Sequence, residues 1–325
     1  MLGEPERELL VEAVEPADVR QDDDADASRL VRRRGEGREA VPVLRVEHEH
    51  VVRDRSAGDR RNGWQRVELE AHPVATIPAS RGDTLRRVQN ALLAWFERNG
   101  RDLPWRGTRD PYAILVSEVM LQQTQVERVV PRWHAWLERW PTIDALAEAS
   151  PAEVIREWQG LGYNRRAINL HRAARVVVER GWPDDLTELP GVGRYTADAV
   201  ARFAHEQPVL PVDVNVARVQ ARTGARFAPA AAAALMDLGA TVCLARVPRC
   251  GACPLSAACP SRGRRFEPER KQSRFEGSFR QRRARALRAV AAGAVPLDRL
   301  DVEAVEALAH DGLVHIAGGT ASLPA

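Results

Sequence analysis

Lysine is almost absent from this chain of 325 residues, because Lys271 is the one lysine among 48 basic side chains. Chemistry that needs a lysine amine, such as Schiff-base formation, therefore has a single candidate. Long apolar runs are also missing, and none approaches the ~20 consecutive apolar residues that cross a bilayer. Met1 is followed by Glu4, Glu6 and Glu8 rather than by a basic and then apolar signal region, so we expect a cytoplasmic protein with no membrane partner.

Cysteine is scarce as well, and all four cysteines lie within 17 residues, in the pattern Cys243-x6-Cys250-x2-Cys253-x5-Cys259. Such a cluster cannot staple a fold of this size, but it suits one metal centre in an intracellular protein. Zinc sites usually combine two close cysteine pairs, whereas this set has one close pair with medium gaps on either side. The spacing therefore favours a [4Fe–4S] cluster over zinc.

The net charge of +3 is unevenly distributed along the chain. Residues 1–82 hold 14 arginines against 18 acidic residues, which gives −4, and they show no sustained apolar periodicity. We expect them to be a disordered extension, or the natural product to begin near Leu85. The other 243 residues hold 34 basic and 27 acidic groups, which gives +7. A basic folded part indicates a polyanionic partner.

From Thr84 to about Ala240 apolar residues recur at helical spacing, with short proline and glycine breaks, so this region is predicted to be all-α. An arginine-rich linker follows the last cysteine. Helical patterns then cover residues 280–292 and 300–310, and short apolar pieces follow them. Residues 263–325 are accordingly predicted to be a linker and a small appendage, which either resembles a winged helix or only packs on the core.

Three motifs hold candidate functional residues. In Leu189-Pro-Gly-Val-Gly-Arg-Tyr-Thr-Ala197 two glycines allow a tight turn before a helix whose free N–H groups could bind a phosphate, although a plain interhelical loop has the same pattern. Glu118 lies in an otherwise apolar helix that begins near Pro111. It is either buried, where keeping its charge would be costly, or a surface glutamate that faces solvent. Asp213 lies at a helix start, as a functional carboxylate or simply as an N-cap.

A capping-box pattern from Thr124 to Glu127 predicts a new helix there, with Gln122 and Gln123 at the junction.

These motifs together resemble the helix-hairpin-helix DNA glycosylases, and among them the MutY-type adenine-specific mismatch glycosylases. The resemblance runs from about Leu92 to Cys259. It rests on LPWRGTRDPYAILVSEVMLQQTQV, GLGYNRRAINLH, LPGVGRYTADAV, VDVNVARV and the four-cysteine loop, in that order.

The resemblance implies a two-lobed all-α enzyme, over residues 83–262, with a C-terminal iron–sulfur loop. One lobe of six helices would cover residues 107–212, and the cluster lobe would combine residues 83–106 with 213–262. Such an enzyme acts as a monomer on double-stranded DNA. It flips out an adenine mispaired with 8-oxoguanine or guanine and hydrolyses its N-glycosidic bond in base excision repair.

The resemblance also implies catalytic roles. Glu118 matches the general acid that protonates the adenine ring, Asp213 the carboxylate that stabilises the cationic sugar, and Tyr195 an active-site tyrosine. Loss of a purine leaves an oxocarbenium-like sugar, so the reaction needs one carboxyl that holds a proton and another that stays ionised. An apolar helix face around Glu118 would raise its pKa, while a helix N-terminus favours an ionised Asp213.

DNA contacts are implied for a further set of residues: Gln122, Gln123, Thr124, Leu161, Tyr163, Gly191, Gly193, Arg194 and Asn215. Among them Gln123 and Tyr163 match residues that wedge into the stack beside the opposing base. Relatives that also break the strand use a lysine after the residue matching Arg194, and here that position is Tyr195. We therefore expect a monofunctional glycosylase without efficient lyase activity.

The chain departs from the family pattern in three places. Where the family has two adjacent tyrosines, this chain reads Gly162-Tyr163-Asn164 and lacks the second ring. The segment between Arg222 and Leu235 is shorter than in relatives. Residues 263–325 are too few for the MutT-like domain that recognises 8-oxoguanine in many relatives. The preference between 8-oxoguanine and guanine therefore stays open. Three alternatives also stay open: a thymine or uracil glycosylase at G mismatches, a non-catalytic DNA-binding iron–sulfur module, and a zinc-stabilised regulator with a winged-helix tail.

Overall fold

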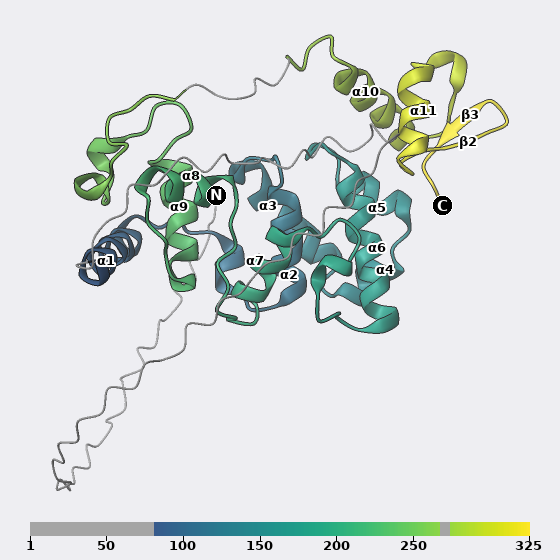
Figure 1. Ribbon diagram of the computed structural model, residues 1–325. Coiled ribbons are helices and arrows are strands. Elements are labelled where there is room, and N and C mark those ends of the chain that lie inside the picture. Colours follow the sequence, from purple (N-terminus) through teal and green to yellow (C-terminus); the bar gives the residue numbers. More distant parts are fainter. Residues whose placement is uncertain (1–80, 267–273) are drawn as a thin grey trace, which may run out of the picture. The chain divides into compact units, whose positions relative to one another are not determined.

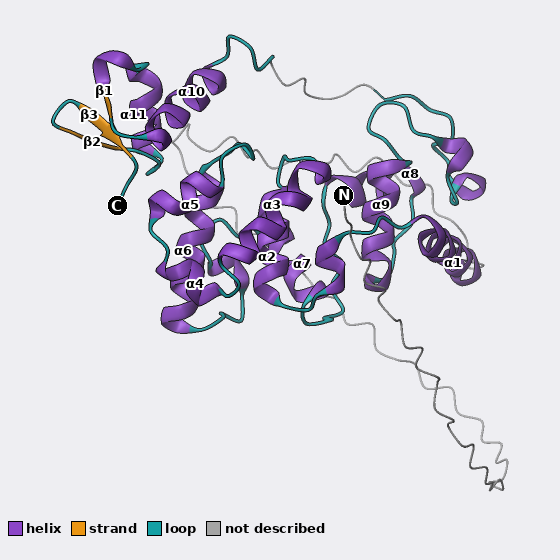
Figure 2. Ribbon diagram, turned by 180° about the vertical axis from the view of Figure 1, so that it is seen from behind, coloured by secondary structure: helices purple, strands orange, loops and turns teal. Residues whose placement is uncertain are grey.

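A computed structural model describes residues 81–266 and 274–325. The extension predicted for residues 1–82 lies, apart from its last two residues, outside this range. The described chain is mainly helical, as Figures 1 and 2 show. The α-helices are α1 (Arg81–Asn99), α2 (Pro111–Leu121), α3 (Val126–Arg139), α4 (Ile143–Glu148), α5 (Pro151–Glu157), α6 (Arg165–Arg180), α7 (Arg194–Phe203), α8 (Val214–Thr223), α9 (Ala232–Thr241), α10 (Phe279–Ala292) and α11 (Val302–His310).

Short 3-10 helices and three strands complete the described elements. The 3-10 helices are η1 (Pro104–Gly107), η2 (Leu186–Glu188), η3 (Pro229–Ala231), η4 (Cys250–Ala252), η5 (Ser256–Ala258) and η6 (Leu297–Arg299). The strands are β1 (Val295–Pro296), β2 (His315–Ala317) and β3 (Thr320–Ser322). They form an antiparallel sheet in the order β1-β3-β2, in which Val295 pairs with Ala321 and Ile316 pairs with the same residue.

Helices α2 to α7 share one hydrophobic core, in which α2 packs against α3, α6 and α7. Asp110 caps α2 by accepting a hydrogen bond from the Tyr112 backbone N–H, and Pro111 begins the helix, a position that suits proline. Every residue from Tyr112 to Met120 is buried. Tryptophans line this core with their rings edge to face, Trp136 lying 4.6 Å from Trp140. Helix α2 is thus surrounded by protein on all sides.

A second core joins α1 with α8 and α9, which lie more than a hundred residues further along the chain. Leu92 and Trp95 from α1 pack with Val219 of α8 and Leu235 of α9. The buried Asp237 on α9 also forms ion pairs with two arginines near η1, at 2.7 and 2.8 Å. Paired in this way, a carboxylate can be buried without a large loss of stability.

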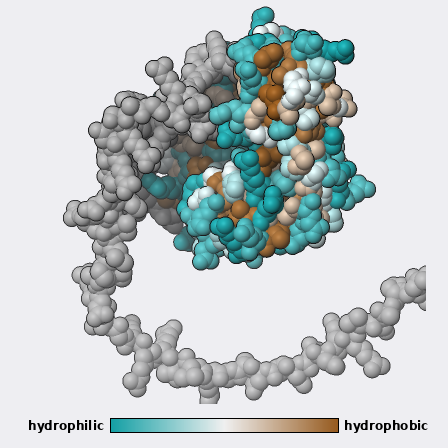
Figure 3. Space-filling model, turned by 90° about the vertical axis from the view of Figure 1, so that its right-hand side faces the viewer, coloured by the Kyte–Doolittle hydropathy of each residue, from teal (hydrophilic) through white to brown (hydrophobic). Residues whose placement is uncertain are grey.

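A third core lies between α10, α11 and the small sheet, and it includes two residues from the first group of helices. Ile155 of α5 and Ile168 of α6 pack with Leu287, Val305 and Leu308. The helical patterns predicted over 280–292 and 300–310 thus correspond to α10 and α11, and the apolar pieces after them to β2 and β3. Seen from the side that carries α11 in Figure 1, the surface has hydrophobic patches among hydrophilic residues (Figure 3). Within the described ranges no helix combines the length and apolar character of a membrane span.

Candidate active site

Glu118 is the one acidic residue of α2 and lies on the last turns of this buried helix. Its side chain is 5% exposed, and its Oε2 atom is buried without a hydrogen-bond partner. The pKa of this carboxyl is raised from 4.5 to about 7, chiefly by burial; a hydrogen bond from Tyr195 lowers the pKa, and the nearby charge of Asp213 adds to the rise. The carboxyl therefore still holds its proton in many molecules at neutral pH.

Tyr195 is the second residue of α7, directly after the two-glycine turn. Burial, followed by the charges of Glu118 and Asp213, raises the pKa of its phenol well above the ordinary value. The phenol thus stays protonated and donates its hydrogen bond towards Glu118. A fixed donor at this position can orient the carboxyl without taking its proton.

Asp213 is the N-cap of α8, as its position in the sequence predicted. Its Oδ1 atom accepts hydrogen bonds from the backbone N–H groups of Asn215 at 2.9 Å and Val216 at 2.7 Å, and its Oδ2 atom accepts one from the Asn215 side chain at 2.8 Å. Three donors and the positive end of the α8 dipole suit a negatively charged carboxylate. Helices α2, α7 and α8 thus bring together Glu118, Tyr195 and Asp213, which are far apart in the sequence.

The turn between η2 and α7 contains two glycines, Gly191 and Gly193, whose surroundings differ. Gly191 has a φ of +80°, and a Cβ added to it would lie 2.7 Å from the Cβ of Asn169 on α6. Gly193 is the N-cap of α7 with a φ of −93°, and apart from its neighbours in the chain nothing lies within 4 Å of the place its Cβ would take. Arg194 follows with an exposed side chain that pairs with Asp198 at 3.0 Å. The α7 N-terminus is therefore open to a ligand at Gly193.

The junction between α2 and α3 confirms one part of the sequence prediction and contradicts another, because a new helix begins just after Gln122 and Gln123 but without the predicted capping box. Helix α3 has Gln125 as its N-cap, without a side-chain capping bond, so the capping box predicted at Thr124 is wrong. The Thr124 hydroxyl instead contacts the Leu161 carbonyl at 3.2 Å, because a distant turn offers it a partner. Gln122 ends α2, with its amide nitrogen 3.5 Å from the Thr196 hydroxyl. Gln123 is exposed and has a φ of +60°.

The turn before α6 holds the other predicted DNA-contacting residues. Tyr163 is 48% exposed and has a φ of +46°, a conformation that costs a non-glycine residue on the order of 1–3 kcal/mol. Leu161, also predicted to contact DNA, is 3% exposed and packs in the first core. Its side chain is therefore part of the core, so the predicted contact of Leu161 with DNA stays a prediction for its backbone.

The sequence analysis missed Arg166, which is buried on α6 and bonds both turns. Its Nη1 atom donates to the Gln122 carbonyl at 2.6 Å, and its Nη2 atom donates to the Gly162 carbonyl at 2.9 Å. A signal was present in the sequence, since Arg166 occupies the same helical face as Leu170 and Val177, both buried. An arginine on the apolar face of a helix indicates a buried set of acceptors.

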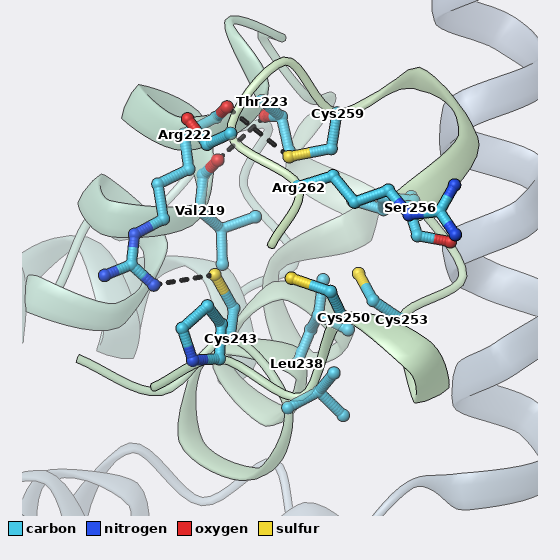
Figure 4. Close-up of a pocket in the computed structure, with 14 residues that line it drawn as sticks. Val219, Arg222, Thr223, Leu238, Cys243, Cys250, Cys253, Ser256, Cys259 and Arg262 are labelled. Carbon is cyan, nitrogen blue, oxygen red and sulfur yellow. Dashed lines mark hydrogen bonds between the residues drawn. The ribbon is translucent and has the colours of Figure 1, made fainter. Parts of the chain in front are cut away.

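All four cysteines line one cavity between α8, α9 and the loop that follows (Figure 4). The Cys243 sulfur accepts a hydrogen bond from Arg222 at 3.4 Å, and the Cys250 sulfur accepts one from the backbone of Gly263 at 3.3 Å. Donors of this kind suit thiolates. The cavity therefore gathers four thiol groups, two of which accept hydrogen bonds from protein donors.

Hydrogen bonds run from the cysteine loop to Asp213. Arg218 donates to the Cys243 carbonyl at 2.8 Å and to the Asn215 side chain at 2.5 Å, and Asn215 contacts Asp213 as described above. Gly239 on α9 allows this approach, because a Cβ there would lie 2.6 Å from the Asn215 Cβ. Asn215 is therefore held in place by contacts with α8 and α9, while part of it stays exposed.

Comparison with known proteins gives consistent results. Residues 116–233 match the HhH-GPD superfamily of base excision DNA repair proteins. The adenine DNA glycosylase of Mycolicibacterium smegmatis is 45% identical over 268 residues, which cover 69% of this chain and 91% of that protein. The human adenine DNA glycosylase is 40% identical over 230 residues, which cover 59% of this chain and 41% of that protein.

Among solved structures, a thermostable thymine-DNA glycosylase is 27% identical with a TM-score of 0.50, covering 55% of this chain and 97% of that one. The matches confirm the family that the motifs predicted, and the helical architecture agrees with them. This chain therefore belongs to the MutY-type adenine DNA glycosylases of the HhH-GPD superfamily.

Proposed function

We propose that this protein removes adenine from double-stranded DNA in which the adenine is mispaired with 8-oxoguanine or guanine, and that it does so as a monomer in base excision repair. Membership of the adenine DNA glycosylases supports the base and the reaction. The observation that carries the mechanism is the buried, proton-holding Glu118 near Asp213, a carboxylate supplied with three hydrogen-bond donors.

The two carboxyl groups have opposite tasks in this mechanism. With its pKa raised to about 7, Glu118 holds a proton at neutral pH that it can donate to a ring nitrogen of the flipped-out adenine. The glycosidic bond then breaks with its electron pair passing to the base, and the ionised Asp213 stabilises the cationic sugar. Water adds to the sugar carbon and loses a proton, which completes the hydrolysis. Tyr195 holds the Glu118 carboxyl in place.

DNA binding is assigned to the two turns and to the start of α7. Gln123 and Tyr163 are exposed and suit insertion into the base stack, with Gln122 and Thr124 beside them. The open N-terminus of α7 at Gly193 suits a phosphate, with Gly191 shaping the turn and Arg194 adding charge. Asn215 acts through Asp213, and Leu161 contributes its backbone carbonyl to the turn rather than its side chain.

The separate hydrophobic cores support the domain division as a proposal. Helices α2–α7 would form the six-helix lobe and α1, α8 and α9 the cluster lobe. The appendage would comprise α10, α11 and the sheet, which is compatible with a winged-helix-like unit.

The cysteine loop fits an iron–sulfur cluster better than zinc. Zinc sites usually combine two close cysteine pairs, whereas this loop has one close pair, Cys250 and Cys253, with longer gaps on either side. Four thiolates spaced around one cavity suit a [4Fe–4S] cluster, which offers each cysteine its own iron. When bound, such a cluster would cross-link the loop from Cys243 to Cys259. Purified protein should contain four iron and four sulfide per chain, and one zinc without iron would overturn the assignment.

Base release from four duplexes tests the function. The duplexes carry A:8-oxoguanine, A:G, T:G and U:G, respectively. The native protein should release adenine from the first two and no base from the other two. Glu118→Gln should slow this release by about 10²–10⁴-fold, the usual contribution of a general acid. Glu138→Gln, which changes an exposed glutamate on α3, is the matched control and should act like the native protein. The rates at which the native protein releases adenine from the A:8-oxoguanine and A:G duplexes establish which mismatch it prefers.

A second candidate is release of thymine or uracil opposite guanine, which the likeness to the solved thymine-DNA glycosylase favours. The same experiment separates the two candidates. Release of thymine or uracil from the G mismatches, without release of adenine, would replace the first proposal by the second.

We further propose that strand cleavage does not accompany base release. The residue after Arg194 is Tyr195, and Lys271 lies in the predicted linker outside the described residues. A phenol cannot form a Schiff base with the opened sugar. Borohydride should therefore trap no covalent adduct between protein and DNA during turnover, and a trapped adduct would contradict this proposal.

A further inference from the structure

Two turns present exposed side chains in a conformation that L-residues rarely adopt. Gln123 follows α2 with a φ of +60°, and Tyr163 precedes α6 with a φ of +46°. Glycine at either position would relieve the backbone, yet the chain has large side chains there. Strain of this kind persists where surrounding contacts hold the backbone in place. The contacts that hold these two turns converge on one side chain, that of Arg166.

The first set of contacts ends helix α2. Arg166 Nη1 donates to the carbonyls of Val119 at 2.7 Å, Met120 at 3.0 Å and Gln122 at 2.6 Å. The last carbonyls of a helix have no partner inside the helix, and a cation is favourable there. The guanidinium thus donates the hydrogen bonds that backbone N–H groups of a further helical turn would donate. The helix can therefore end before Gln123 with these carbonyls paired.

The second set of contacts holds the turn before α6. Arg166 Nη2 donates to the carbonyls of Leu161 at 3.2 Å and Gly162 at 2.9 Å, and Nε donates to that of Tyr163 at 3.4 Å. The Thr124 hydroxyl accepts from Nη2 at 3.1 Å and itself contacts the Leu161 carbonyl at 3.2 Å. One planar group therefore joins both turns, and Thr124 adds a second link between them.

Charge and shape limit this position to arginine. The side chain is 9% exposed, and burial lowers its pKa to about 10, so it remains a cation at neutral pH. Its guanidinium also lies 5.2 Å from the Trp158 ring centroid and 5.7 Å from that of Tyr163. Lysine keeps the charge, but its single ammonium group cannot reach two turns at once or stack on both rings.

We propose that Arg166 is a positioning residue that sets Gln123 and Tyr163 as a rigid pair for insertion into the DNA stack. The proposal rests on the insertion role proposed above for these two side chains. Arg166 acts on the opening of the duplex and leaves bond cleavage at Glu118 unchanged. Without it, each turn can relax separately and the pair loses its common geometry.

The test compares Arg166→Lys with Arg175→Lys, a matched change at an exposed arginine of the same helix. An A:G duplex with 2-aminopurine next to the adenine reports insertion, since the fluorescence of this base rises when it is unstacked. Arg166→Lys should reduce the rise on binding at least fivefold and the single-turnover rate at least tenfold. Arg175→Lys should change neither.

The pH dependence separates positioning from general damage to α2, because Arg166 also bonds the carbonyls of Val119 and Met120, next to Glu118. The pH at which the single-turnover rate is half-maximal should be the same in Arg166→Lys and in the native protein. A shifted midpoint, a slow variant with the full fluorescence rise, or a variant as fast as the native protein would overturn the proposal.

Thr124→Val keeps Arg166 and removes the second link, so it serves if Arg166→Lys does not fold. It should show a two- to fivefold smaller fluorescence rise. An unchanged rise would count against the proposed link between the two turns. Failure of the proposed function looks different from either result. In that case the native protein itself would release no adenine, or would give no fluorescence rise on the mismatched duplex.

Discussion

Glu118 is a titratable group on a helix whose other buried residues are almost all apolar, and its neighbours act on its proton in opposite directions. Burial and the charge of Asp213 favour the protonated form, while the Tyr195 hydrogen bond favours the carboxylate. The resulting pKa of about 7 suits an acid that works at neutral pH. The same proton links activity to stability, so both can be measured through single substitutions.

Glu118→Gln should stabilise the protein at alkaline pH while it slows base release by about 10²–10⁴-fold. The folded protein binds this proton more tightly between pH 4.5 and about 7, so the contribution of Glu118 to stability is present below pH 4.5 and is lost as the pH rises through 7. The amide has no charge to bury. The free energy of unfolding at pH 8 should rise by about 1–3 kcal/mol, with a smaller rise at pH 5.

Urea denaturation of both proteins at the two pH values measures this difference, with Glu138→Gln as the exposed control. An equal difference at pH 5 and pH 8 would show that the pKa of Glu118 is not raised in the folded protein, because the folded and unfolded chains would then bind the same number of protons over this range.

Tyr195→Phe should move the alkaline limit of activity to higher pH. Removing the phenol removes the hydrogen bond that favours the Glu118 carboxylate, so the pKa of Glu118 rises. We expect the pH of half-maximal single-turnover rate to increase by about 0.5–1 unit. A midpoint that moves to lower pH would mean that Tyr195 holds the protonated form of the carboxyl instead.

Helix ends matter as much as side chains in this site. Helix α8 begins at a carboxylate that its own N–H groups bind, and α7 begins at a glycine with open space in front of it. Gly191 and Gly193 are two residues apart, yet the first is required by backbone conformation and packing and the second by neither. This difference makes them a useful pair of substitutions.

Gly191→Ala and Gly193→Ala should have opposite profiles. The first forces an L-residue to a φ of +80° against Asn169 and should lower the free energy of unfolding by about 1–3 kcal/mol. The second should change stability by less than about 1 kcal/mol. It should weaken binding of duplex DNA by about tenfold, because its methyl group would occupy the space in which a phosphate accepts hydrogen bonds from α7. Thermal unfolding and DNA titration measure the two effects, and Gly193→Ala with native affinity would exclude a phosphate there.

The cores are connected through helices rather than through the linkers between them. Ile155 and Ile168 belong to α5 and α6 but pack with the residues of α10 and α11, and Arg156 donates to the Ala291 carbonyl at 3.2 Å. The C-terminal residues therefore cover apolar surface of the enzyme core. This surface, rather than any charge on α10, is the reason to expect an effect on stability when they are removed.

A chain that ends at Phe266 should be less stable than the full chain. Exposing Ile155 and Ile168 should lower the free energy of unfolding by about 3–6 kcal/mol, given ~1.5–3 kcal/mol for each isoleucine side chain taken out of water. Urea denaturation at neutral pH measures it. Unchanged stability in the shortened chain would mean that the third core forms no stabilising contact with α5 and α6.

Local signals in the chain were sufficient for many features. Pro111, and Asp213 before an apolar helix, predict helix starts because the first turn of a helix depends on neighbouring residues only. The apolar neighbours of Glu118 predict its burial and raised pKa for the same reason. The spacing of the cysteines likewise predicts a shared site, since a short loop brings its own residues together.

Contacts between distant segments could not be read in this way. Thr124 bonds the turn at Leu161 instead of capping α3, Leu161 points inward, and Gly191 meets Asn169, because each of these residues responds to a segment tens of positions away. Arg166 is the clearest case: its partners become visible only when α2 and α6 are packed together. Hydrogen bonds within one turn depend on adjacent residues, whereas the burial and pairing of a side chain depend on which helices pack around it.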